Sequence, residues 1–128
     1  MTNSKLNPKP TSPHFDVEER TALFGERAIN FAKKLPVTVV SRLLIDQVVR
    51  AATSVGANYC EANDAGSRPD FKHKLGICRK ESKESMYWFR MIGTTFPESS
   101  ATARELWQEA KELNLIFSAA IRSTKQNS

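Results

Sequence analysis

Several features that mark membrane, exported or disordered proteins are missing from this sequence of 128 residues. No apolar run approaches the roughly 20 residues that a membrane-spanning helix needs. The first eight residues hold no apolar stretch of the kind found in a secretory signal. Hydrophobic residues make up 40% of the chain and charged residues 26%, which is too apolar for a disordered protein. We therefore expect one globular domain, located in the cytoplasm and not attached to a membrane.

The residues from which most catalytic and metal sites are built are also scarce. Cys60 and Cys78 are not spaced as a Cys-x-x-Cys pair, and we expect both to be reduced thiols in the core. Di-iron helical bundles use Glu-x-x-His on two helices, whereas here the nearest match is one copy of Asp70-x-x-His73. The sequence has no glycine-rich phosphate loop, nucleophile elbow or Ser/His/Asp set. These absences predict a protein without metal, cofactor or enzymatic activity.

The few prolines divide the chain into segments. Three of the six lie within residues 1–15, which we predict to be a flexible arm. Pro36, Pro69 and Pro97 separate long proline-free segments, and proline is tolerated in a first helical turn but not in a helix interior. Short links between long helices imply antiparallel neighbours. We predict an all-α fold, an antiparallel up-down four-helix bundle over residues 16–122, followed by a disordered tail over residues 123–128.

The ends of the predicted helices carry capping signals. We predict the four helices to begin at or near Asp16, Thr38, Ser67 and Pro97. Asp16 has the spacing of a capping box with Glu19, and Ser67 is a predicted N-cap. Gly93 is predicted to follow the end of the third helix, as glycine often does. In each helix apolar residues recur at helical spacing, among them Phe24, Phe31, Val48, Val55, Leu75, Phe89, Leu113 and Phe117.

Five polar residues fall on one strip of the second predicted helix. They are Gln47, Arg50, Ser54, Asn58 and Glu61, spaced 3, 4, 4 and 3 apart. A strip facing solvent is one interpretation. Because apolar residues flank it, we favour a buried or subunit-facing polar network, in which the side chains satisfy one another. Glu81 and Glu84 on the third helix are the candidate partners for Arg50.

The third predicted helix carries a basic strip. Lys72, Arg79, Lys83 and Arg90 fall within roughly 40° of one another around the helix, and Lys80 is adjacent. The chain as a whole has a formal net charge of +5. A solvated helix face is one interpretation of such a strip. The other is a surface that binds a polyanion, and it gains force if an oligomer repeats the strip around an axis.

Aromatic residues on the third helix point in more than one direction. Phe89 falls on the core face, while Trp88 falls toward the side of Glu81 and Glu84. Since an isolated bundle has one core seam per helix, a second aromatic edge predicts self-association, with Trp88 at the oligomer interface. The alternative is that Trp88 only flanks the core.

The ordered motifs resemble one known family. They are Gln47-x-x-Arg50-x-x-x-Ser54-Val55-Gly56-Ala57-Asn58-x-x-Glu61-Ala62, Ser67-x-x-Asp70-Phe71-x-x-Lys74-Leu75 and Lys80-Glu81-x-x-Glu84-x-x-Tyr87-Trp88. Over about Glu19 to Ile121 the chain resembles the bacterial four-helix-bundle proteins encoded in intervening sequences of 23S ribosomal RNA genes. That resemblance implies a ring-like homopentamer. It also implies kinship with the accessory variability proteins of diversity-generating retroelements, which are basic pentamers that associate with nucleic acid and a reverse transcriptase.

Two functions are compatible with these features. The first is a non-catalytic, oligomeric protein that binds RNA or DNA without sequence specificity through its basic strip. The second is a protein-interaction scaffold with no role on nucleic acid. Further copies of the chain, RNA or DNA, and a reverse transcriptase or another protein are the expected partners.

Overall fold

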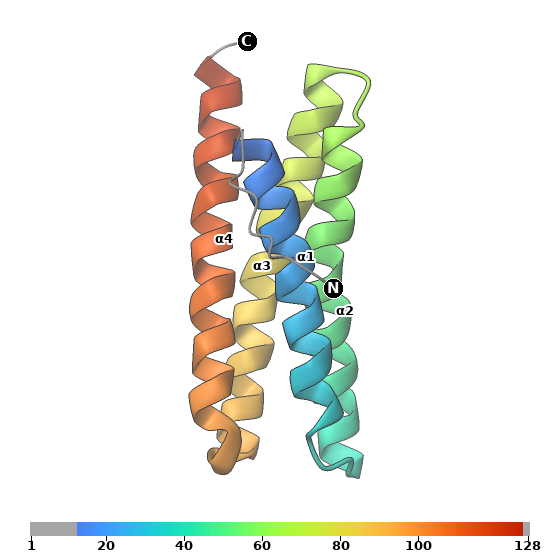
Figure 1. Ribbon diagram of the computed structural model, residues 1–128, viewed down its shortest axis with the longest axis vertical. Helices are drawn as coiled ribbons and strands as arrows, with labels where there is room; N and C mark the ends of the chain where they lie inside the picture. The colour runs from blue at the N-terminus through green and yellow to red at the C-terminus, as the bar shows by residue number, and fades with distance from the viewer. Residues whose placement is uncertain (1–12, 127–128) are drawn as a thin grey trace, which may run out of the picture.

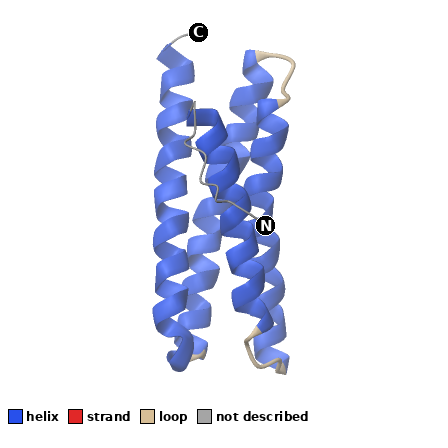
Figure 2. Ribbon diagram, viewed as in Figure 1, coloured by secondary structure: helices blue, strands red, loops and turns tan. Residues whose placement is uncertain are grey.

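The chain forms four long α-helices joined by short connections (Figure 1). In this computed structural model the backbone is described for residues 13–126 and the side chains for residues 17–124. The helices are α1 (Pro13–Lys33), α2 (Val39–Asn63), α3 (Arg68–Thr95) and α4 (Ser100–Gln126), with a short 3₁₀ turn, η1 (Pro97–Ser99), before α4. Residues 13–126 contain no strand (Figure 2). Successive helices run in opposite directions, which confirms the predicted all-α up-down bundle.

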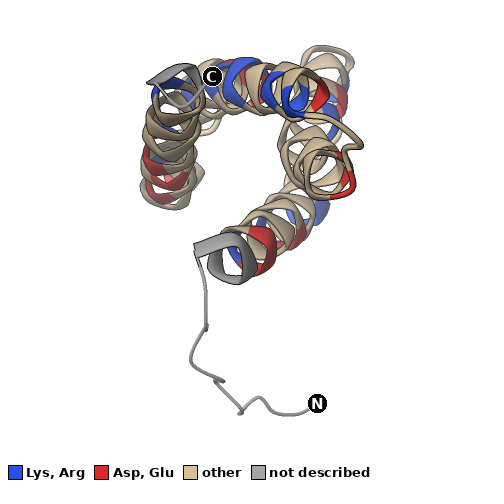
Figure 3. Cartoon of the chain, turned by 90° about the horizontal axis from the view of Figure 1, so that it is seen from above, with Lys and Arg blue, Asp and Glu red and all other residues tan. Residues whose placement is uncertain are grey.

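The four helices surround one core in the order of the chain. α1 packs on α2, α2 on α3 and α3 on α4, so that α3 lies across the bundle from α1 (Figure 3). The seam between α1 and α4 is bridged by ion pairs: Arg20 Nε lies 2.7 Å from Glu109 Oε2, and Arg20 Nη2 lies 2.6 Å from Glu112 Oε1. The hydrogen bond with Glu109 raises the pKa of Arg20. Within the described residues no helix is long and apolar enough to cross a membrane.

Aromatic rings fill the centre of the bundle. Phe24, Phe89 and Phe117 are almost completely buried, and the Phe24 and Phe89 rings meet edge to face with their centroids 6.0 Å apart. The Tyr59 ring packs against Phe117 at a centroid distance of 6.1 Å. Burying a side chain of this size contributes about 1.5–3 kcal/mol to folding. The hydrophobic pattern therefore predicted this core correctly.

Small residues lie on the buried faces of α2 and α3. Ala51, Ala52, Ser82 and Ser85 are fully buried along their core faces. A buried hydroxyl needs a hydrogen-bond partner. Ser85 Oγ donates to the carbonyl of Glu81 at 2.8 Å, and Ser82 Oγ donates to the carbonyl of Arg79 at 2.9 Å. Each hydroxyl thus donates within α3 itself, and Ser82 Oγ also accepts from Asn114 Nδ2 of α4 at 3.2 Å.

Of the four predicted helix starts, two are confirmed, one is wrong, and the fourth, Pro97, begins the short η1 turn that leads into α4 at Ser100. Thr38 caps α2 in a capping box with Ser41, and the Ser67 side chain accepts a hydrogen bond from the Asp70 N–H at 3.2 Å. α1 begins at Pro13, so Asp16 lies inside the helix and does not cap it. Proline at a first helical position is favourable, because that position has no intrahelical N–H bond to lose. Residues 1–12 of the predicted arm lie outside the described residues.

The predicted C-terminal ends are also corrected. α3 continues to Thr95, so Gly93 is not its terminating residue. A Cβ on Gly93 would lie 3.5 Å from the Ala103 Cβ, so this position faces α4 directly. The predicted tail is helical as far as Gln126, and residues 127–128 lie outside the described part. Cys78 is buried as predicted, whereas Cys60 is exposed and not in the core.

Candidate nucleic-acid interface

Arg50 on α2 meets both of its predicted partners on α3. Its Nη1 lies 3.2 Å from Glu81 Oε1, and its Nη2 donates a hydrogen bond to Glu84. The Gln47 Oε1 accepts from Arg50 Nε at 3.3 Å and from Nη2 at 3.2 Å. The Glu81 side chain is only 10% exposed, whereas that of Arg50 is 46% exposed. The network therefore lies at the edge of the α2–α3 seam, with one carboxylate inside and the guanidinium half in solvent.

The rest of the predicted strip on α2 is more exposed than expected. Glu61 is exposed and pairs with Lys74 of α3, whose Nζ lies 2.5 Å from Glu61 Oε1. Ser54 and Asn58 bond to their own helix: Ser54 Oγ donates to the Arg50 carbonyl, and Asn58 Nδ2 donates to the Ser54 carbonyl. Within one chain, the strip on α2 is therefore half-exposed and not a buried network. A helical projection gives the direction of a side chain but not what covers it.

Trp88 is accommodated within the same seam. The ring is half-buried against the core, and its Nε1 donates to Glu84 Oε2 at 3.1 Å. These contacts match the alternative in which Trp88 flanks the core. Exposed apolar side chains gather elsewhere, where α1 connects to α2: Val37, Val39, Val40 and Leu43.

The predicted basic strip lies on the outer side of α3. Arg79, Lys80, Lys83 and Arg90 are exposed, and Lys72 is half-buried. No ion pair joins any of them to an acidic group in the part of the chain whose side chains are described. Seen from above, Lys and Arg residues recur along α3 (Figure 3). The structure thus brings the five predicted cations to one helix surface.

A second row of cations, which was not predicted from the sequence, lies on α4. Arg104, Lys111 and Arg122 are exposed, and their spacings of 7 and 11 place them on one face of the helix. On α3 the residues Lys72, Lys83 and Arg90 are separated by the same two spacings in reverse order. The projection that identified the strip on α3 would have identified this row too.

Hydrogen bonds between α3 and α4 set the register of the two cation rows. Asn114 Nδ2 of α4 donates to the Arg79 carbonyl at 2.8 Å and to Ser82 Oγ at 3.2 Å. Because antiparallel helices rise by the same 1.5 Å per residue, this register sets cations at matching heights on both helices. The resulting two-row surface, called the basic face below, is about 27 Å long. Its matched pairs are Lys72 with Arg122, Lys83 with Lys111, and Arg90 with Arg104.

Five of the six acidic residues of α3 and α4 form ion pairs with arginines of α1 or α2, and the sixth, Asp70, lies in the first turn of α3. Glu81 and Glu84 are held by Arg50 of α2. Glu109 and Glu112 are held by Arg20 of α1 on the opposite seam. The cations of the basic face lie side by side on neighbouring helices and repel one another. None of the described acidic groups pairs with these cations. The basic face therefore has the charge distribution of a surface that attracts a polyanion.

Aromatic groups contribute little to this face. Tyr87 is 54% exposed, but its ring packs edge-on against Trp88 with the centroids 5.0 Å apart. Trp107 of α4 is half-buried, and Lys111 Nζ lies 5.6 Å from its ring centroid. Single-strand binders commonly stack bases on exposed rings. The face is instead suited to contacts with phosphates.

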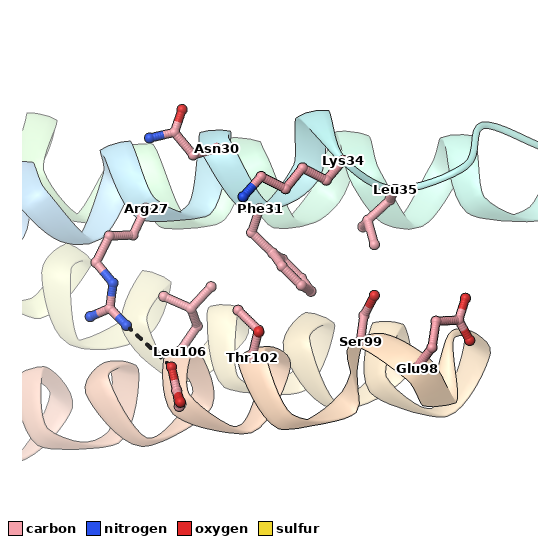
Figure 4. Close-up of a pocket in the computed structure, with 10 residues that line it drawn as sticks. Arg27, Asn30, Phe31, Lys34, Leu35, Glu98, Ser99, Thr102 and Leu106 are labelled. Carbon is pink, nitrogen blue, oxygen red and sulfur yellow. Dashed lines mark ion pairs between the residues drawn. The ribbon is translucent and has the colours of Figure 1, made fainter.

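A hollow of different character lies between α1 and α4 (Figure 4). It has a volume of about 360 Å³, with Phe31, Leu35 and Leu106 as its apolar lining. Charged residues of both signs surround it, and Arg27 Nη2 lies 4.0 Å from Glu105 Oε1 across the seam. This mixture gives no net charge with which to select a ligand. Among the described side chains, no group of three His, Cys, Asp or Glu residues is placed to bind a metal.

Comparisons with known proteins agree with the fold and the motifs. A family model described as 23S rRNA-intervening sequence protein matches residues 14–119. The chain is also similar to a solved structure from Bacteroides thetaiotaomicron, a protein of unknown function from the S23 ribosomal protein family. The two chains are 29% identical with a TM-score of 0.73, over 82% of this chain and 97% of the other. No match is found among curated proteins.

The family match extends over nearly all of the described helices, from the first turn of α1 into the last third of α4. It includes the Arg50 network as well as both cation rows except Arg122. The chain belongs to the 23S rRNA-intervening sequence protein family.

Proposed function

We propose that this chain is a non-catalytic protein that binds RNA or DNA through the basic face, without reading the base sequence. The observation that carries this proposal is the pair of cation rows on α3 and α4, which no acidic side chain neutralises within the described residues. Lysine and arginine contacts with phosphates hold a nucleic acid without specifying its sequence. Rigid helices with few exposed rings favour such contacts over base stacking.

Self-association is part of the proposal, because an oligomer would repeat the basic face. The four exposed apolar residues at the α1–α2 connection are 59–93% exposed, which is unusual for a group of neighbouring large apolar side chains. We propose that a second copy of the chain covers them, in keeping with the ring-like homopentamer that the family resemblance implies. Light scattering on wild type and on a Val39→Asp, Leu43→Asp variant tests this assembly, and a wild type that stays monomeric at micromolar concentration would refute it.

Fluorescence anisotropy with a labelled RNA of about 24 nucleotides and a DNA duplex of about 24 base pairs tests nucleic-acid binding. Affinity should fall steeply with salt, with a log–log slope of about −0.7 to −0.9 for each phosphate contacted. Replacing the central pair, Lys83→Gln with Lys111→Gln, should weaken binding at least about tenfold at moderate salt and make the slope shallower.

The matched control removes two cations of α1 that belong neither to the basic face nor to the apolar group at the α1–α2 connection, Arg27→Gln with Lys33→Gln, and changes the net charge equally. This control should bind almost as tightly as wild type. If both variants lose the same affinity, net charge alone explains binding and the basic face is not the site. If wild type binds neither probe at low salt, the protein-interaction scaffold becomes the better function.

A further inference from the structure

Gly76 occupies an unusual position on the basic face. It lies in the interior of α3, two turns after the helix begins at Arg68 and well before its end at Thr95. Glycine is the least favourable helix residue after proline, because it loses the most backbone freedom on folding. Such a residue in a helix interior needs a reason, and a common one is that another group approaches the backbone closely.

The other helical glycines each face a neighbouring helix inside the bundle, and Gly56 is the most crowded of them. A Cβ on Gly56 would lie 3.3 Å from the Thr21 carbonyl oxygen, and one on Gly93 would lie 3.5 Å from the Ala103 Cβ. A Cβ on Gly25 would lie 3.6 Å from the Thr53 Cα. A Cβ on Gly76 would have no described atom within 4 Å beyond its own helix neighbours. The packing of this chain therefore does not explain the glycine.

The surroundings of Gly76 indicate what could approach it. On a helix surface the nearest neighbours of a residue are those three and four positions away. For Gly76 these neighbours are all basic side chains, and all of them line a hollow of about 530 Å³ together with the glycine: Lys72, His73, Arg79 and Lys80. The rest of its lining is apolar: Pro69 and Ile77 of α3, and Ile121 of α4, which precedes Arg122.

We propose that this hollow, the Gly76 hollow, seats a phosphate of the nucleic-acid backbone at the point of closest approach to α3. The inference rests on the proposed function and adds to it the site of tightest contact. The Gly76 N–H is bonded within the helix, so the glycine supplies space and not a hydrogen bond. Without a Cβ, the phosphate comes nearer to the surrounding basic groups, and attraction between charges grows as their separation falls.

Gly76→Ala separates this role from a structural one. Alanine is the better helix former, so the melting temperature should rise by about 2–5 °C. Affinity for the DNA duplex should nevertheless fall about five- to tenfold, as expected when one charge-assisted contact is weakened. A structural role alone would move stability and binding in the same direction or leave binding unchanged.

Gly25→Ala on α1 is the matched control, since it makes the same substitution across the bundle from α3. It should leave duplex affinity unchanged. If Gly76→Ala binds as tightly as wild type, the inference fails while the proposed function stands. If wild type binds neither nucleic acid, both fail together. If light scattering shows that Gly76→Ala alters the oligomer, the glycine faces another subunit and the inference is wrong.

Discussion

Replacing Arg50 by alanine would leave Glu81 without its cation. The Glu81 carboxylate lies almost entirely inside the protein, with a side chain 10% exposed, and Arg50 Nη1 is 3.2 Å from it. Glu84, which also binds Arg50, is 30% exposed and keeps the Trp88 Nε1–H as a second donor. The consequence of the substitution should therefore come mostly from Glu81.

Two limits bracket the size of the effect. Exposed ion pairs contribute about 0.2–1 kcal/mol, whereas breaking a fully buried pair costs about 3–5 kcal/mol. Here the cation is half-exposed and one carboxylate is nearly buried, so solvent screens part of the attraction. We expect Arg50→Ala to lower the free energy of unfolding by about 2 kcal/mol, between the two limits.

Arg27→Ala provides the matched control. The Arg27 side chain is 42% exposed, close to the 46% of Arg50, but its partner Glu105 is 70% exposed and 4.0 Å away. Its loss should lower the free energy of unfolding by less than about 0.5 kcal/mol. The comparison holds the exposure of the arginine nearly constant and varies the burial of the carboxylate.

Urea denaturation at one fixed protein concentration measures both variants, because an oligomer's apparent stability depends on concentration. A double-mutant cycle of Arg50→Ala with Glu81→Gln should give a coupling of about 1–2 kcal/mol. Equal losses for Arg50→Ala and Arg27→Ala would refute the reasoning, because burial of Glu81 would then have no energetic consequence.

A further substitution and a change of pH test the packing of the core. Gly56→Ala places a Cβ 3.3 Å from the Thr21 carbonyl oxygen. This crowding should outweigh the gain in helix propensity and lower the free energy of unfolding by about 1 kcal/mol in the same urea titration. A stability equal to wild type would mean that α1 and α2 separate freely. Burial raises the pKa of Cys78 and of Tyr59 to about 12. Since these groups ionise at lower pH in the unfolded chain, the melting temperature should be steady up to about pH 8 and fall as pH rises from about 9 toward 12. Cys78→Ala should make the fall in melting temperature shallower. If the dependence of melting temperature on pH is unchanged in this variant, ionisation of Cys78 does not cause the fall.

The fold was predictable because the signals for each helix are local. Apolar residues recur at helical spacing within each helix, as Phe24 and Phe31 do in α1 and Val48 and Val55 in α2, and a helical projection shows which way they face. Helix ends were harder to predict. Glycine is typical of a helix terminus, but Gly93 lies inside α3, where it faces α4. That contact depends on a helix the local sequence does not contain, so local signals misplace the end of α3.

The sequence predicted those parts of the candidate site that lie on one helix or on two helices joined by a short turn. The Arg50 partners on α3 were found because a short turn joins α2 to α3 and fixes which faces meet. The pairing of Lys83 with Lys111 depends on the register between α3 and α4, which Asn114 helps to set through its bonds to α3. The register between α3 and α4 is set by how their whole faces pack, so the sequence pattern of α4 alone does not predict it.

Charge in this bundle is divided between two tasks. Arg20 and Arg50 lie on different seams, and each is held by two glutamates, so these cations join helices. The cations of the basic face pair with no glutamate in the described part of the chain, and their mutual repulsion opposes folding. Removing Lys83 and Lys111 should therefore leave stability unchanged or raise it slightly, while binding falls. Removing Arg50 should have the opposite result: it should lower stability with little direct effect on nucleic-acid binding by the basic face. The sign of the change in stability on substitution therefore distinguishes residues that stabilise the fold from residues that bind a partner.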